Sequence, residues 1–116
     1  MTPGTYAKGG AGLVIMESTK VERRGCGTVG DLGIWEDAHI PGLKRCVDFI
    51  RQHNSVPGIQ LGHSGRKARR FRPWEGGAPL KNGPGVWDWE GWELVSSSAM
   101  NNPPTDPTPR ALSHRP

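Results

Sequence analysis

The chain has 116 residues, of which 34% are hydrophobic, and it contains 17 glycines and 11 prolines. This length suits one small domain or part of a larger one, and the low hydrophobic share limits the core to a small size. The net charge of +4 fits an anionic partner, such as a nucleic acid, an anionic membrane surface or a phosphorylated cofactor, but on charge alone an ordinary solvated surface is the leading interpretation. Two cysteines without C-x-x-C spacing argue against a metal site, and no apolar run has transmembrane length.

The first element predicted along the chain is a short strand at residues 12–17, "GLVIME". Its branched apolar side chains, bounded by glycine, are typical of a parallel-sheet strand that is buried on both faces. Residues 18–36 are polar and contain several glycines, which predicts a long loop. We expect Trp35 to anchor this loop on apolar surface.

A helix is predicted over residues 37–53, "DAHIPGLKRCVDFIRQH", because apolar residues recur there at three- and four-residue steps. These residues are Ile40, Leu43, Val47 and Ile50. Asp37 is the expected N-cap, and Pro41 is compatible with the first turn, where its missing N–H group does no harm.

A second short strand is predicted at residues 56–62, "VPGIQLG". The order strand, loop, helix, strand indicates a βαβ unit with parallel strands and a right-handed crossover. Folds of this kind bind ligands at the carboxyl ends of their strands. We therefore expect Glu17, Ser18, Gln60 and His63 to lie on one face of the sheet.

From residue 69 onward the periodicity disappears, and four of the five tryptophans lie among glycines and prolines. Tryptophans in such a segment are expected to pin a long loop to the body of the protein. "WELV" predicts one short strand. Residues 101–116 are expected to be an extended or disordered tail, which leaves residues 1–100 as the folded part.

Five sequence blocks follow one another in the order and spacing of a known family: "GGAGLVIMEST", "GDLGIWEDAHIPGLKR", "GIQLGHSGRKA", "RPWEGGAPL" and "WELVSSSAM". Together they resemble the Old Yellow Enzyme family of NADH:flavin oxidoreductases, and most closely its bacterial xenobiotic-reductase-like ene-reductases. The resemblance implies an α/β fold, a partial TIM (β/α)8 barrel. The βαβ unit would supply strands 2 and 3 of that barrel, followed by a long Trp-, Gly- and Pro-rich loop region. Because a complete barrel needs at least about 200 residues, we expect an N-terminal fragment, a truncated gene model or a decayed copy.

The resemblance also assigns roles to individual residues. Gln60 would hydrogen-bond the pyrimidine edge of FMN, and Ser18, at a position that is often alanine, would offer its backbone beneath the flavin. Lys67 would lie at the rim of the substrate cavity, with His63 and Arg66 as supporting residues. No catalytic residue is assigned, because the family's substrate-holding His pair and proton-donating Tyr have no counterpart here.

The implied activity is a cytoplasmic, FMN-dependent transfer of hydride from NAD(P)H to the activated C=C bond of a small enone or related electrophilic alkene. No nucleic-acid or membrane partner is expected, and the isolated chain is expected to be inactive. One alternative is an inactive fragment or pseudoenzyme without bound flavin. Another is a small basic RNA-binding module, suggested by "RKARRFR" at residues 66–72. The substrate, the choice between NADH and NADPH and the oligomeric state stay open.

Overall fold

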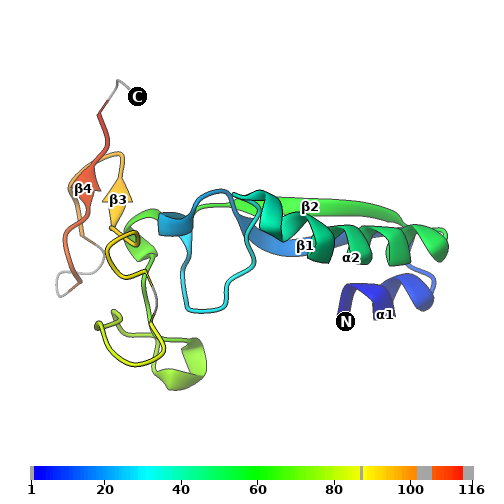
Figure 1. The fold of residues 1–116 in the computed structure, drawn as a ribbon, viewed down its shortest axis with the longest axis horizontal. Helices are drawn as coiled ribbons and strands as arrows, with labels where there is room; N and C mark the ends of the chain where they lie inside the picture. Colours follow the sequence, from blue (N-terminus) through cyan, green and yellow to red (C-terminus); the bar gives the residue numbers. More distant parts are fainter. Residues whose placement is uncertain (1, 87, 102–105, 114–116) are drawn as a thin grey trace.

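The computed structural model describes residues 2–86, 88–101 and 106–113. Its helices and strands are α1 (Thr2–Lys8), β1 (Leu13–Lys20), α2 (Ile40–Gln52), β2 (Val56–Gly62), β3 (Val95–Ser96) and β4 (Arg110–Ala111). Four 3-10 turns complete it: η1 (Arg23–Gly25), η2 (Asp37–His39), η3 (Gly65–Lys67) and η4 (Pro73–Glu75). The βαβ unit and α1 form one end of the molecule, and the loops with β3 and β4 form the other (Figure 1). The radius of gyration, 16.6 Å, exceeds the value of about 13 Å for a compact chain of this length, so the arrangement is open.

The predicted βαβ unit is confirmed, because β1 and β2 pair in parallel with α2 between them in sequence. One face of β1 packs against both helices through Val14 and Met16, which are buried with Ala7 of α1 and Ile50 of α2. This apolar cluster is what holds the helices on the sheet, because burying such side chains is the main favourable term in folding.

β1 is longer than predicted and runs through Ser18 to Lys20 instead of ending near Glu17. The extension is held by the following loop, which returns to the strand: the Lys20 N–H donates to the Leu32 carbonyl, and the Ile34 N–H donates to the Lys20 carbonyl. The predicted loop therefore begins after Lys20 rather than at residue 18, and it contains the 3-10 turn η1.

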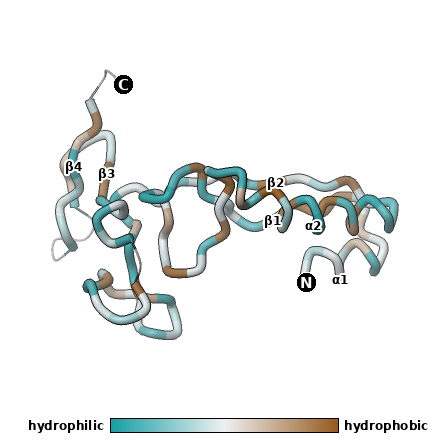
Figure 2. The backbone as a smooth tube through the Cα atoms, viewed as in Figure 1, coloured by the Kyte–Doolittle hydropathy of each residue, from teal (hydrophilic) through white to brown (hydrophobic). Residues whose placement is uncertain are grey.

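The prediction that β1 is buried on both faces is wrong for this chain. Leu13 and Ile15 are 57% and 59% exposed, whereas Val14 and Met16 between and after them are buried. The helices cover one face, and no described residues cover the other. Figure 2 shows hydrophobic positions along the chain of the βαβ unit.

The start of the predicted helix also differs from expectation. Asp37 does not cap α2; it begins the 3-10 turn η2, which runs directly into the helix after His39. Pro41 lies in the first turn of α2, as predicted. α1 was not predicted, because a seven-residue helix containing Pro3 and Gly4 has a weak sequence signal. It forms because Ala7 is buried in the apolar cluster.

A second apolar cluster surrounds Trp92, which is fully buried together with Cys26 and Leu80. The Trp92 Nε1–H donates to the Cys26 carbonyl at 2.8 Å, and the Arg23 guanidinium lies 4.2 Å from the centroid of the Trp92 ring. This tryptophan therefore anchors the long loop, as predicted. Trp74 does not, since it is 80% exposed, and Trp87 lies outside the described residues.

Of the strand predicted at "WELV", only the last residue, Val95, belongs to a strand. This strand, β3, pairs in parallel with β4. β4 lies within the segment expected to be a tail, and Asp106 in that segment is buried. Residues 102–105 and 114–116 of the same segment lie outside the described residues.

Candidate functional site

The carboxyl ends of β1 and β2 bring the predicted polar residues together through a shift in strand register. Met16 is paired with Ile59, and the next pair is Thr19 with Leu61. Two residues of β1, Glu17 and Ser18, therefore face the single residue Gln60 of β2. An irregularity of this bulge type redirects side chains where pairing is interrupted. The expected convergence of Glu17, Ser18 and Gln60 is thus a consequence of the register.

Gln60 presents a free amide at this position. Its side chain is exposed, and within the described residues it makes no hydrogen bond. An amide offers both donors and acceptors, so this group can pair with a ligand that has both on one edge. Its neighbours Ile59 and Leu61 alternate with it along the strand, and the register places them on the face that carries Met16 and Thr19.

The hydroxyl of Ser18 accepts a hydrogen bond from Lys20, a residue that was not predicted to belong to the site. The Lys20 Nζ donates to the Ser18 Oγ at 2.9 Å and lies 3.9 Å from the Asp31 carboxylate. A Cβ atom at Gly62 would lie 2.4 Å from the Ser18 Oγ, so glycine at this position of β2 leaves room for the serine side chain. The signal for Lys20 was its two-residue spacing from Ser18, which puts both side chains on one face of a strand.

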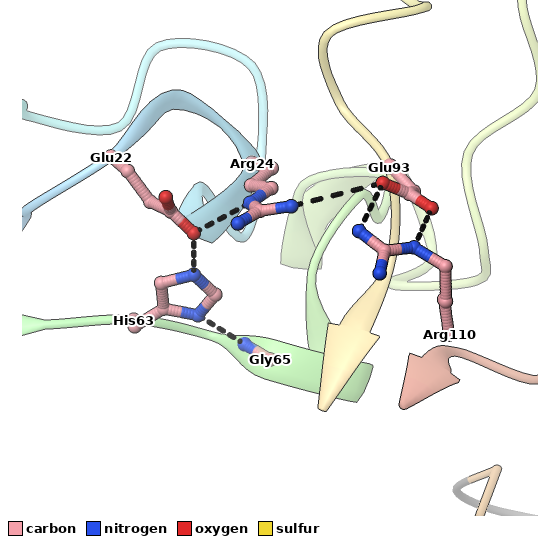
Figure 3. Close-up of polar contacts among 6 residues, drawn as sticks. All are labelled: Glu22, Arg24, His63, Gly65, Glu93 and Arg110. Atoms are coloured by element: carbon pink, nitrogen blue, oxygen red, sulfur yellow. Dashed lines mark hydrogen bonds and ion pairs between the residues drawn. The ribbon is translucent and has the colours of Figure 1, made fainter. Parts of the chain in front are cut away.

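His63, just after β2, is fixed by both ring nitrogens (Figure 3). The Gly65 backbone N–H donates to its Nδ1 at 3.0 Å, and its Nε2 lies 2.7 Å from the Glu22 carboxylate. Because a backbone N–H can only donate, Nδ1 carries no proton, and the proton of the neutral ring is on Nε2. The imidazole therefore donates to Glu22. The ring also packs on Gly25, where a Cβ atom would lie 2.7 Å from the imidazole Cδ2.

Glu22 connects His63 to the C-terminal strands (Figure 3). The Arg24 Nε donates to the same Glu22 oxygen at 2.8 Å, and the Arg24 Nη1 lies 3.8 Å from Glu93. Glu93 in turn accepts hydrogen bonds from the Arg110 Nε and Nη2 at 2.5 Å and 3.1 Å. This chain of charges couples the end of β2 to the segments that carry β3 and β4.

The hydrogen bonds at Glu22 predict an acid-sensitive structure. Burial tends to raise the pKa of Glu22, but the hydrogen bonds from His63 and Arg24 outweigh it and hold the pKa below its usual value of 4.5. A carboxylate with a lowered folded-state pKa stabilises the protein above its unfolded pKa, and this contribution disappears as the pH falls through the folded value. We expect the folded state to lose stability below about pH 4.5 and Glu22→Gln to weaken that dependence. Urea unfolding at several pH values measures it. An unchanged pH profile in Glu22→Gln contradicts the prediction.

Arg66 and Lys67 lie on η3, directly after His63 and Ser64. Within the described residues their side chains make no hydrogen bond or ion pair, so both cations are available at this end of the strand. The other cations of the same basic stretch serve the fold: Arg69 donates to the Trp92 carbonyl, Arg70 to Asp106, and Arg72 to the Val29 carbonyl. These contacts favour a structural role for them over an RNA-binding surface.

Other classes of site have no support in the described part of the chain. Across residues 2–86, 88–101 and 106–113, no group of three or more His, Cys, Asp or Glu side chains is placed to hold a metal ion. Cys26 and Cys46 are both free thiols. None of the described helices combines the length and apolar character needed to cross a membrane.

A parallel βαβ unit with polar residues gathered at its strand ends is the building unit of α/β barrels and of doubly wound sheets, whose sites lie at that end. A sequence profile of the NADH:flavin oxidoreductase / NADH oxidase family matches residues 5–85. The chain belongs to this family, and the resemblance to Old Yellow Enzymes is confirmed. The family is one of oxidoreductases that use a flavin and a nicotinamide nucleotide.

The similar proteins are longer chains, of which this chain matches a part. It is 52% identical over 65 residues to an NADPH dehydrogenase of Bacillus cytotoxicus, covering 56% of this chain and 19% of the relative. An NADPH dehydrogenase of Listeria monocytogenes serotype 4a is also 52% identical, over 62 residues, covering 53% of this chain and 18% of the relative. The chain thus spans about a fifth of the length of these curated relatives.

The solved structures that match include morphinone reductase in complex with tetrahydroNAD. Its TM-score is 0.70 at 25% identity, and the match covers 98% of this chain and 32% of that one. A second structure of morphinone reductase gives a TM-score of 0.67 at 26% identity, covering 93% of this chain and 29% of that one. The predicted partial TIM barrel is confirmed by these likenesses, and the uncovered face of β1 belongs to an incomplete barrel wall.

Proposed function

We propose that this chain is the part of an FMN-dependent oxidoreductase that contacts the flavin ring. The whole enzyme would transfer hydride from NAD(P)H to the activated C=C bond of a small enone or related electrophilic alkene. The observation that carries the proposal is the register shift that sets Glu17 and Ser18 opposite the free amide of Gln60, at the carboxyl ends of two parallel strands.

The residues at this strand end fit FMN. The Gln60 amide has the donor and the acceptor needed to pair with the adjacent N–H and C=O groups of a flavin pyrimidine edge. In this proposal Ser18 contributes through its backbone, while its hydroxyl accepts a hydrogen bond from Lys20. When bound, FMN would supply the hydride chemistry, and the protein would supply orientation and electrostatics. Lys67, with Arg66 beside it, would favour negative charge at the rim of the site.

The FMN-contacting part lies within residues 1–100 in this proposal, and the isolated chain is inactive. It offers one edge of a flavin site, while the uncovered side of β1 leaves that edge open to water. We further propose a cytoplasmic enzyme that acts on small molecules and binds neither nucleic acid nor membrane. The engagement of Arg69, Arg70 and Arg72 within the fold supports the absence of an RNA-binding role.

A chimera tests the proposed function. Residues 5–85 would replace the matching segment of the Bacillus cytotoxicus NADPH dehydrogenase, with the unmodified enzyme as the control. We expect the chimera to copurify with FMN and to oxidise NADPH in the presence of 2-cyclohexen-1-one, and the isolated chain to do neither. A folded chimera that contains no FMN would contradict the proposal and favour an inactive, flavin-free fragment.

A further inference from the structure

The η3 turn, which carries Arg66 and Lys67, is held by the imidazole of His63. Ser64 precedes the turn, and its side chain makes no capping hydrogen bond. The first N–H of the turn, that of Gly65, donates to His63 Nδ1 instead. Gly65 has a φ of +55°, a conformation that glycine adopts at little cost. The Gly65 N–H therefore depends on Nδ1 for its acceptor, while the flanking Ser64 and Arg69 N–H groups donate to the Gly25 and Cys26 carbonyls.

The contact with Glu22 keeps the proton of the neutral His63 ring on Nε2, which leaves Nδ1 able to accept a hydrogen bond. The Glu22 carboxylate lies at Nε2, 2.7 Å away, and accepts the proton of the neutral ring. The charged groups around the ring are Glu22 in direct contact, Arg24 on the same carboxylate oxygen, and Glu93 behind Arg24. The lowered pKa of Glu22 supports the same arrangement, because an ionised carboxylate is purely an acceptor.

Protonation of His63 would break the contact with the turn. An imidazolium ion carries a proton on both nitrogens, so its Nδ1–H would face the Gly65 N–H across 3.0 Å. Two N–H donors repel each other at that distance. The contact between Nε2 and Glu22 would instead become an ion pair. The ring would stay on Glu22, and the first N–H of the turn would lose its acceptor.

We propose that His63 is a positioning residue which, in its neutral Nε2–H form, holds the η3 turn and thereby places Arg66 and Lys67 at the end of β2. Protonation of the ring releases the turn, so the placement of these two cations depends on pH. The consequence for the substrate rim rests on the proposed function. The tautomer and its hold on Gly65 rest on the geometry alone.

Two matched variants of the complete 116-residue chain separate the two ring contacts. His63→Asn keeps an acceptor near the Nδ1 position but does not reach Glu22. His63→Gln reaches Glu22 with its amide but offers no acceptor to Gly65. The readouts are the imidazole ¹⁵N chemical shifts and the hydrogen-exchange rate of the Gly65 amide, both followed by NMR from neutral to acidic pH.

In the unmodified chain at neutral pH, we expect an unprotonated Nδ1 and a protected Gly65 amide. That protection should be lost as the ring becomes protonated. His63→Asn should keep the protection at all these pH values. At neutral pH, His63→Gln should exchange roughly five- to tenfold faster than the unmodified chain, the factor that corresponds to one lost hydrogen bond, and the two rates should converge as the ring becomes protonated. A proton on Nδ1 of the neutral ring, or equal Gly65 exchange in the unmodified chain and His63→Gln at neutral pH, would overturn the inference.

The same substitutions in the chimera keep this result separate from the proposed function. If the chimera lacks FMN while Gly65 exchange follows the expected pattern, the proposed function fails and the role of His63 stands. If FMN is bound and the Gly65 exchange rate does not change with substitutions at His63, the proposed function stands and the role of His63 fails.

Discussion

Trp92→Ala is expected to destabilise the loop region by about 3–5 kcal/mol, the range for truncating a fully buried large aromatic side chain. Trp92 has no exposed surface and forms the centre of the second apolar cluster. The substitution also removes the hydrogen bond to the Cys26 carbonyl and the ring on which the Arg23 guanidinium lies. The carbonyl left without its donor adds to the loss, because an unsatisfied buried polar group is unfavourable.

Trp74→Ala is the matched control, because Trp74 is 80% exposed and a surface substitution of this kind changes stability by about 0.5 kcal/mol or less. Amide hydrogen exchange resolves where the stability is lost. Protection should fall around Cys26 and Leu80 in Trp92→Ala and persist around Ile50, which belongs to the other cluster. Equal protection in the two variants would show that Trp92 does not hold the loop.

Gln60→Leu in the chimera is expected to weaken FMN binding about ten- to a hundredfold, equivalent to about 1–3 kcal/mol. Leucine keeps the approximate size of glutamine but removes its donors and acceptor. The polar edge of the flavin would then lack partners in a site from which water is excluded, which is costlier than exposure. Equilibrium titration with FMN, followed by flavin fluorescence, measures the change.

Ile59→Asn is the control for this second prediction. The register places Ile59 on the face of Met16. It is 39% exposed in this chain, but a complete barrel would cover this face, so asparagine there should damage folding of the chimera before it affects affinity. Gln60→Leu should instead leave the melting temperature of the flavin-free chimera nearly unchanged. FMN binding as tight as in the parent chimera, with the fold intact, would exclude Gln60 as a flavin-contacting residue.

Local patterns in the sequence were enough for the central architecture. The period of the apolar residues identified the helix, and the bounds of β2 agree with the prediction at residues 56–62. The order of these elements implied parallel strands, because a helical crossover returns the chain in the same direction. The family resemblance, which depends on blocks of contiguous residues, was recovered for the same reason and then confirmed.

The candidate site was predicted only in part. Ser18 and Gln60 were predicted near the strand ends and lie at facing positions, whereas the contacts among Glu22, Arg24 and Glu93 were not predicted. Glu22 and His63 are 41 positions apart, and no local period relates them. Lys20 was overlooked because the first strand was expected to end before it. The extension of this strand to Lys20 involves hydrogen bonds with the loop that returns to it.

By itself the sequence determined the order of the elements, the parallel βαβ unit and the family. The tertiary structure decided which tryptophan is buried, which groups the two ring nitrogens of His63 contact, and which two residues of β1 face Gln60. Each of these depends on contacts between distant positions; Trp92 and Cys26, for example, are 66 residues apart. Local propensity acts over a few residues, whereas burial, strand register and the pairing of charges are properties of surfaces that meet only when the chain has folded.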